Sequence, residues 1–261
     1  MDMKTATRDG VALRYAHADG GQGRPILLVH GWCCDHTFFA PQFEFFAKAG
    51  HTVVAPDLRG HGASDAPDGA YSMQVFSDDL LWLAGELCLE RPIVIGHSMG
   101  GIVAFDLAVR HPETVAAIAM IDSAVFRPAA SRANMPAFLE KLKGPAYREA
   151  VTAYVRSALF IPTDDPANEA PILARMTATP RHVMIGAFEG MRDFDPLAAG
   201  APKMPSLFIS ADGKPLSDMA RFLALVPDMM TGQTVGSGHF APIEVPEQVD
   251  AMLARFVKLA G

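Results

Sequence analysis

The chain has 261 residues, 50% of them hydrophobic, and a formal net charge of −7. This length and apolar content fit one large α/β domain or a core with a sizeable insertion, while the negative charge provides no basic surface for nucleic acid. No apolar run approaches the ~18 residues that a membrane span needs, and the first ten residues lack the apolar stretch of a signal peptide. We therefore expect a cytoplasmic protein without a membrane span.

Short apolar segments alternate with helical patterns along most of the chain. Residues 11–15 alternate between apolar and polar side chains, as a half-buried strand does. Five continuous apolar runs follow, which are typical of strands buried on both faces of a parallel sheet: residues 25–30, 52–56, 92–95, 115–121 and 205–210. Helical patterns occur at 38–48, 72–89 and 246–259, and residues 235–239 are predicted as the last short strand with its loop. The alternation predicts an α/β fold with a mostly parallel, doubly wound sheet.

One long segment interrupts this alternation. Residues 123–202 contain no apolar run of the buried-strand type, and they carry four helical patterns separated by prolines, near 136–143, 147–159, 169–176 and 182–192. We therefore predict a core made of residues 1–122 and 203–261, with residues 123–202 as a helical insertion that covers the site.

The most informative motif is Gly-His-Ser-Met-Gly at residues 96–100, between the apolar run at 92–95 and a helical pattern. A strand, then Gly-x-Ser-x-Gly, then a helix is the context of a nucleophile elbow, a turn too tight for side chains at its two glycines. The serine, Ser98, also lies at a helix N-terminus, where free N–H groups favour developing negative charge. The motif predicts that Ser98 is a nucleophile.

Two further segments carry a resemblance to the α/β-hydrolase superfamily, in its small capped form. His-Gly-Trp at residues 30–32 resembles the family segment that supplies one oxyanion-hole N–H, and the residue after the nucleophile supplies the other. The resemblance thus implies the backbone N–H groups of Trp32 and Met99 as donors. Gly-Ser-Gly-His at residues 236–239 resembles the loop of the catalytic histidine, which implies His239 as the general base.

Residues 57–64 resemble another hallmark of the family, a loop after the third core strand. We interpret this loop as structural, with Asp57 and Arg59 pairing or capping backbone groups and with glycines that permit positive φ. His61 is interpreted as part of this scaffold rather than as an acid–base group.

The acid that would orient His239 departs from the usual family pattern. In most relatives it follows the strand that corresponds to 205–210, in a Gly-x-x-Asp turn, but here Lys214 stands at that position and cannot accept a hydrogen bond. Three other carboxylates come into question. Asp122 ends the run at 115–121, where certain haloalkane dehalogenases and cofactor-free dioxygenases of the family carry their acid. Asp212 lies two positions early in the usual turn, and Asp218 fits a helix N-cap better. We predict Asp122, with Asp212 as the alternative.

Apolar side chains near these motifs predict an apolar substrate. We expect Phe240, Phe126 and Cys33 to contact it, and side chains of the insertion to cover it. The candidates in the insertion are Met135, Phe138, Tyr154, Met184, Phe188 and Met191. Cys34 is interpreted as packing, because no partner base is identifiable.

Together the motifs predict a serine hydrolase that cleaves an ester, thioester or lactone through an acyl-enzyme, with no cofactor. The spacing of the three cysteines indicates neither a disulfide framework nor a zinc site, so no metal is expected. Serine at the elbow argues against haloalkane dehalogenases and epoxide hydrolases, which use aspartate there. Two alternatives stay open: a C–C bond hydrolase or cofactor-free ring-cleaving dioxygenase of aromatic degradation, and a small-molecule receptor that keeps the triad.

Overall fold

The computed structural model describes residues 2–21, 23–213 and 215–260. Its centre is an eight-stranded sheet with the strand order β1-β2-β4-β3-β5-β6-β7-β8. β2 pairs antiparallel with β1 and β4, whereas every pairing from β4 to β8 is parallel. The strands are β1 (Met3–Arg8), β2 (Val11–Ala18), β3 (Ile26–Val29), β4 (Val53–Pro56), β5 (Ile93–His97), β6 (Ala117–Ile121), β7 (Ser206–Ser210) and β8 (Met230–Gln233). The predicted fold class is confirmed.

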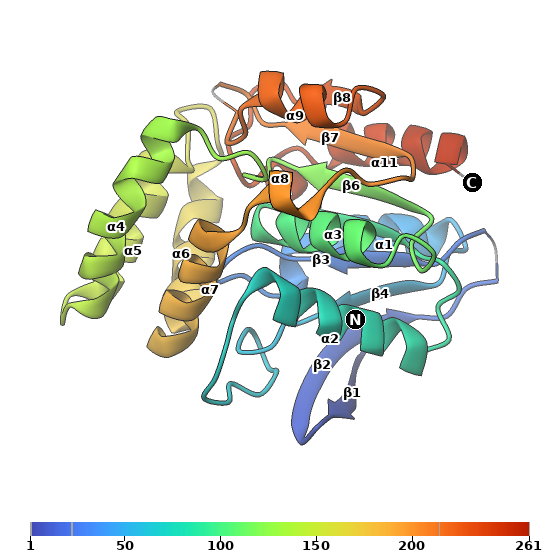
Figure 1. Cartoon of the computed structure of the whole chain (residues 1–261), viewed down its shortest axis with the longest axis horizontal. Coiled ribbons are helices and arrows are strands. Elements are labelled where there is room, and N and C mark those ends of the chain that lie inside the picture. The colour runs from blue at the N-terminus through green and yellow to red at the C-terminus, as the bar shows by residue number, and fades with distance from the viewer. Residues whose placement is uncertain (1, 22, 214, 261) are drawn as a thin grey trace.

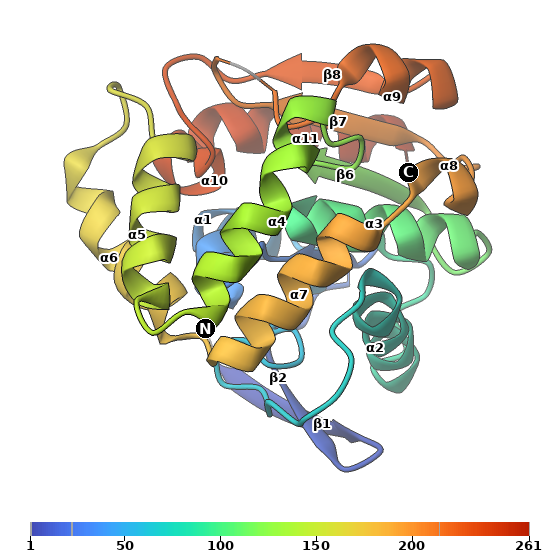
Figure 2. The ribbon, with the colours of Figure 1, turned by 60° about the vertical axis from the view of Figure 1, so that its left-hand side comes forward.

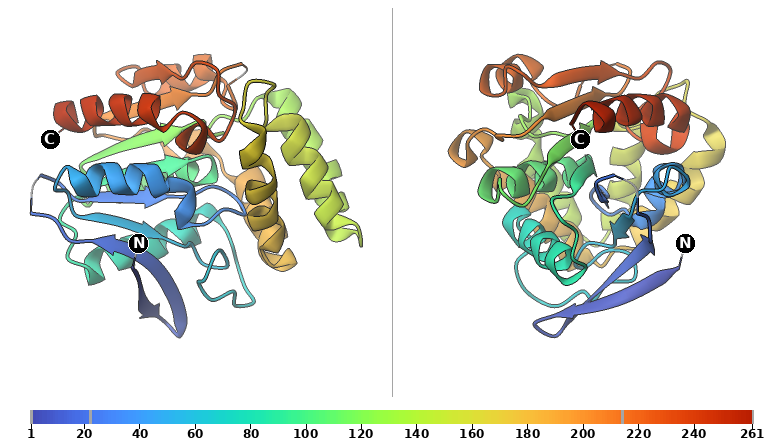
Figure 3. Two further views of the ribbon diagram at one scale, coloured as in Figure 1. Left: turned by 180° about the vertical axis from the view of Figure 1, so that it is seen from behind. Right: turned by 90° about the vertical axis from the view of Figure 1, so that its right-hand side faces the viewer.

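Helices cover both faces of the sheet because its central strands are apolar on both sides. Along β3, Leu27 and Val29 pack toward one face, and Ile26 and Leu28 pack toward the other. The first face is covered by α2 (Met73–Glu86), α3 (Met99–Arg110) and α9 (Met219–Leu225), and the second by α1 (Ala40–Lys48) and α11 (Pro246–Ala260) (Figures 1 and 3). A short 3-10 helix, η1 (His36–Phe39), precedes α1, and α10 (Ala241–Glu244) precedes α11.

Five helices separate β6 from β7, and residues 123–202 contain no strand. Four of them form the group that we call the helical insertion: α4 (Ala129–Lys143), α5 (Tyr147–Ala158), α6 (Pro166–Ala178) and α7 (Arg181–Asp193). α4 packs against α5 and α7, and α5 packs against α6. The group stands at one end of the sheet (Figures 1 and 2). The fifth helix, α8 (Pro196–Ala199), packs against α3. None of the helices among the described residues is both long and apolar enough to cross a membrane.

The two outermost strands differ from the sequence prediction. β1 was not predicted, because its side chains are polar and largely exposed. The last strand is β8, so the strand predicted within 235–239 was wrong, whereas the loop predicted there is present and follows β8. Val235 is 74% exposed, and Gly236 has φ 73°, which turns the chain out of the strand. An edge strand lacks the continuous apolar signature of a central strand.

Candidate active site

Ser98 lies in the sharp turn between β5 and α3. Its backbone has φ 55° and ψ −118°, a conformation that residues other than glycine rarely adopt. A Cβ atom at Gly96 would lie 2.1 Å from the carbonyl oxygen of Gly100, and one at Gly100 would lie 2.0 Å from that of Val29. The turn therefore closes only with glycine at both positions. The Ser98 N–H donates to the carbonyl oxygen of Ile121 at 2.9 Å, which fixes the turn against β6.

Asp122 follows β6 and meets His239 from the far end of the chain. Asp122 Oδ2 lies 2.7 Å from His239 Nδ1, and the two residues are only 3% and 6% exposed. The Asp122 N–H donates to the carbonyl oxygen of Ile209 at 2.7 Å, which fixes the backbone of Asp122 against β7. Because an ionised carboxylate only accepts, His239 Nδ1 carries the proton and its Nε2 presents a free lone pair.

The other two candidate acids have different partners. Asp212 accepts hydrogen bonds from the backbone N–H groups of Gly213 at 2.8 Å and Gly236 at 2.9 Å, so it holds the loop that leads to His239. Asp218 caps α9 by accepting from the N–H of Arg221. Of the three carboxylates, the structure brings Asp122 to the imidazole. Lys214, the residue at the usual acid position, lies outside the described residues.

His97, which the sequence analysis did not single out, contacts both the backbone and the ring of His239. Its Nε2–H donates to the carbonyl oxygen of His239 at 2.8 Å, and the two ring centroids are 4.5 Å apart. Burial holds the pKa of His97 well below its ordinary value, so the ring is a neutral donor. The only sequence signal for it was its place before Ser98 in the elbow.

The loop between α5 and α6 also holds the His239 segment. The N–H of His239 donates to the carbonyl oxygen of Leu159 at 2.9 Å, and the N–H of Gly238 donates to Asp164 Oδ1 at 2.6 Å. A Cβ atom at Gly238 would lie 2.8 Å from the Leu159 oxygen, so glycine is required for this approach. The sequence analysis missed Leu159 and Asp164, because nothing in their local pattern indicates a contact so distant in the chain.

Trp32 and Met99 line the same pocket as Ser98. The backbone N–H group of neither residue donates in the hydrogen bonds that the described residues form. The segment before Trp32 is held by His30, which donates from Nδ1 to the carbonyl oxygen of Gly31 and accepts the N–H of Leu58 at Nε2. Two free N–H groups beside a serine hydroxyl can hold a developing oxyanion.

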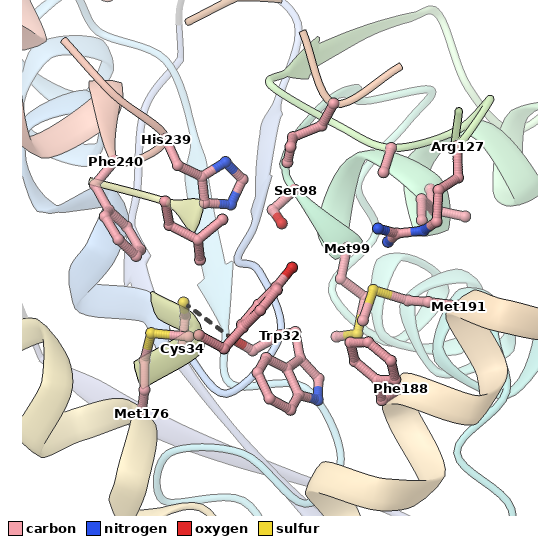
Figure 4. Close-up of a pocket in the computed structure, with 15 residues that line it drawn as sticks. Trp32, Cys34, Ser98, Met99, Arg127, Met176, Phe188, Met191, His239 and Phe240 are labelled. Carbon is pink, nitrogen blue, oxygen red and sulfur yellow. Dashed lines mark hydrogen bonds between the residues drawn. The ribbon is translucent and has the colours of Figure 1, made fainter. Parts of the chain in front are cut away.

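The pocket encloses a cavity of only about 30 Å³, far below the roughly 300–1,000 Å³ of a typical ligand site. Phe240 lines it, whereas Phe126 and Cys33 do not: the ring of Phe126 packs against Phe222, and the neighbouring Cys34 takes the place expected of Cys33. Figure 4 shows the His239 ring and the Ser98 hydroxyl turned toward each other at the same end of the pocket. The lining consists of Trp32, Cys34, Ser98, Met99, Ile102, Ala124, Arg127, Tyr154, Leu159, Met176, Phe188, Met191, Leu216, His239 and Phe240.

The loop at 57–64 does not contribute to this pocket. Asp57 accepts from the N–H groups of His36 and Ala63, whereas Arg59 pairs with Asp79 rather than with Asp57. Burial lowers the pKa of His61 to about 3, and its Nδ1–H donates to the Arg59 carbonyl oxygen. The loop is therefore a hydrogen-bonded scaffold beside β4, and its histidine, His61, is neutral. Among the described residues, no group of His, Cys, Asp and Glu side chains could hold a metal ion.

Comparison with known proteins agrees with this architecture. Residues 24–150 match the family model of the alpha/beta hydrolase fold. The solved enol-lactonase from Burkholderia xenovorans LB400 superimposes with a TM-score of 0.87, covering 98% of this chain and 100% of that one at 23% sequence identity. The chain belongs to the α/β-hydrolase superfamily.

Two further comparisons place this α/β hydrolase among its relatives. A thermophilic esterase from Thermogutta terrifontis superimposes with a TM-score of 0.85 over 100% of this chain and 99% of that one, at 23% identity. At such identities the likeness is one of fold. The AB hydrolase superfamily protein YisY of Bacillus subtilis is 40% identical over 93 residues, which are 36% of this chain. The match spans 35% of that relative, about a third of its length.

Proposed function

We propose that this α/β hydrolase cleaves a carboxylic ester, thioester or lactone through a covalent acyl-enzyme on Ser98. The observation that carries the proposal is the 2.7 Å hydrogen bond between Asp122 and the Nδ1 atom of His239, a residue that lines the same pocket as the strained Ser98. A serine hydroxyl is a weak nucleophile at neutral pH, and it needs a neighbouring imidazole that takes its proton. Ser98, His239 and Asp122 supply the three roles.

In the acylation half, Ser98 Oγ attacks the substrate carbonyl carbon while His239 Nε2 takes the hydroxyl proton. Asp122 stabilises the resulting imidazolium and stays ionised. The oxyanion accepts from the N–H groups of Trp32 and Met99, and removal of one such donor in comparable sites costs about 10²–10³ in rate. The imidazolium then gives its proton to the leaving oxygen or sulfur, and the acyl group remains on Ser98.

In the deacylation half, water replaces the leaving group. His239 Nε2 takes one proton from water as the hydroxide oxygen forms a bond to the acyl carbon. The tetrahedral intermediate collapses, Ser98 Oγ takes the proton back, and a free carboxylic acid leaves. No hydrogen bond of the described residues joins Ser98 Oγ to the His239 ring, and such bonds often tighten only once substrate is bound.

We further propose that residues 123–202 act as a cap over this chemistry. Tyr154, Leu159, Met176, Phe188 and Met191 of that segment line the pocket. Because the cavity is only about 30 Å³, a substrate enters when these side chains or their helices move aside. The largely apolar lining favours a substrate with an apolar portion.

The decisive experiment combines a fluorophosphonate probe with short-chain p-nitrophenyl esters. Labelling of the wild-type protein at Ser98, mapped by peptide mass spectrometry, together with ester turnover supports the proposal. Ser98→Ala serves as the control that loses both. A folded wild-type protein that neither reacts with the probe nor releases p-nitrophenol would overturn it.

The position of the acid favours a second candidate. Asp122 follows β6 rather than β7, which is where the cofactor-free ring-cleaving dioxygenases resembled by the sequence carry their acid. Such an enzyme would consume oxygen in the presence of an aromatic substrate and hydrolyse simple esters poorly. An oxygen electrode run beside the ester assay distinguishes the two functions.

A further inference from the structure

Arg127 is a buried cation without an anionic partner. It is 8% exposed, its Nε is fully buried without a hydrogen-bond acceptor, and its Nη1 makes only a 3.4 Å hydrogen bond to Ser131 Oγ. No carboxylate among the described residues lies within ion-pair distance of this guanidinium. Arginine is rarely buried unless it is paired, because removing its charge from water is costly.

The groups around this guanidinium do not neutralise it. Burial lowers the pKa of Arg127, the nearby Arg132 lowers it further, and the phenol of Tyr154 is the group that opposes both effects. At neutral pH the phenol is uncharged, so it can accept one hydrogen bond from the guanidinium but cannot balance its charge. An unbalanced positive charge therefore faces the pocket.

The guanidinium lies in the pocket of the candidate active site. Arg127 lines that pocket together with Ser98, and Figure 4 shows its nitrogen atoms turned toward the interior, on the side of Met99. The rest of the lining is mostly apolar. A single charge-bearing donor in an apolar pocket fixes the orientation of a ligand that has one complementary group.

The backbone around Arg127 is held by the core rather than by the insertion. The N–H of the preceding residue, Phe126, donates to Ser217 Oγ at 3.1 Å, and its carbonyl oxygen accepts from the N–H of Asp218 at 2.7 Å. α4 begins two residues after Arg127. The core thus fixes the backbone from which the Arg127 side chain extends into the pocket, and this restricts where the guanidinium can lie before a ligand arrives.

We propose that Arg127 binds a carboxylate of the substrate, so that the ester or lactone cleaved at Ser98 is one that also carries a free carboxylate. The proposal rests on the proposed function. A planar guanidinium matches a carboxylate with two parallel N–H donors. A carboxylate brings one negative charge to one positive charge, whereas a phosphate monoester dianion would leave a second charge uncompensated in an apolar pocket.

The test compares two substrates of the same shape. Monomethyl glutarate carries a free carboxylate, and methyl 5-amino-5-oxopentanoate carries a neutral amide in its place. Initial rates of acid release, followed in a pH-stat at pH 7.5, give kcat/KM for each. We expect the wild-type protein to prefer the anionic ester by about 10- to 100-fold, the range of a charge-assisted hydrogen-bond pair.

Two variants connect that preference to Arg127. In Arg127→Gln the preference falls to near unity, whereas Arg132→Gln, which removes an exposed cation of the same segment, keeps it. A second readout needs no turnover: monomethyl glutarate raises the melting temperature of Ser98→Ala, and the added Arg127→Gln change abolishes that shift.

The outcomes distinguish the two proposals. Equal kcat/KM values for the two esters in the wild-type protein would overturn the role of Arg127 while leaving the esterase function in place. An equal loss of preference in both variants would also overturn it, because a general field of positive charge would then explain the selectivity. Failure of the fluorophosphonate probe and of both esters would instead overturn the proposed function. The wild-type comparison decides the matter even if Arg127→Gln does not fold.

Discussion

Asp164, in the loop between α5 and α6, accepts a 2.6 Å hydrogen bond from the backbone N–H of Gly238, the residue before His239. Its other oxygen accepts from the N–H of Ile161 at 2.8 Å, and the side chain is buried. One carboxylate thus joins a loop outside the sheet to the segment that carries the imidazole. Since a charge-assisted bond of this kind is short and strong, it restricts where the imidazole can lie.

Asp164→Asn should lower kcat about 10-fold with little change in KM, because the bond to Gly238 loses its charge, a loss worth about 1.5 kcal/mol. The measurement is steady-state ester hydrolysis. Asp165→Asn is the matched control, since Asp165 is exposed and its side chain caps α6 through the N–H of Ala167. Equal effects in both variants would show that the loop as a whole, and not the contact to Gly238, matters for rate.

Asp122→Asn should lower kcat by up to about 10⁴, because an amide facing Nδ1 favours the wrong tautomer of His239, as in the serine protease template. Asp212→Asn should reduce kcat far less, since Asp212 holds backbone N–H groups and does not bond the imidazole. Rates of both variants at saturating ester, with circular dichroism to verify folding, test this assignment. The reverse order of effects would transfer the role of the acid to Asp212.

Gly31→Ala should reduce kcat about 10- to 100-fold, because even a small displacement of the Ser98 nucleophile from its reactive position slows the reaction strongly. The added Cβ would lie 3.1 Å from the Ser98 Cβ and 3.3 Å from His97 Nδ1, so the elbow must shift. Gly85→Ala is the control: nothing lies within 4 Å of its added Cβ, and its helical position predicts a gain of about 0.5–1 kcal/mol in stability. A fully active Gly31→Ala would contradict this account.

The free energy of unfolding should fall as the pH is lowered from about 6.5. Burial lowers the pKa of His61 to about 3, and it also lowers the pKa values of His30 and His97. Below pH 6.5 the unfolded chain therefore binds more protons than the folded protein does. Each such histidine lowers the free energy of unfolding by up to about 1.4 kcal/mol for every unit by which the pH falls. Urea unfolding at several pH values measures the slope. His61→Gln should make it shallower, and an unchanged slope would refute a neutral His61.

The sequence predicted the strands that are apolar on both faces, from β3 to β7, because such runs have a strong local signature. It did not predict β1 or place β8, since edge strands are stabilised by pairing with a neighbour rather than by their own pattern. It also pointed to Asp122, because parallel strands of one sheet bring their carboxyl ends together.

Side chains that act through distant contacts could not be predicted in the same way. Asp164 and Gly238 are 74 positions apart, and no local motif connects them. Arg127 is a residue type that is usually exposed, so its burial beside Ser98 follows only from the packing of the loop after β6.

Several hydrogen bonds tie the helical insertion to the core, and two of these links lie next to the candidate site. The α5–α6 loop holds the His239 segment, and the Trp32 Nε1–H donates to the carbonyl oxygen of Met184 in α7 at 2.9 Å. A movement that admits substrate by lifting either part breaks one of these bonds. In the proposed mechanism, substrate entry and catalytic readiness therefore exclude each other in time. An open molecule would lack a correctly held imidazole or oxyanion segment, and Ser98 would become reactive only after the entrance has closed. An electrophile that reaches the open form would then meet a serine that is not yet activated.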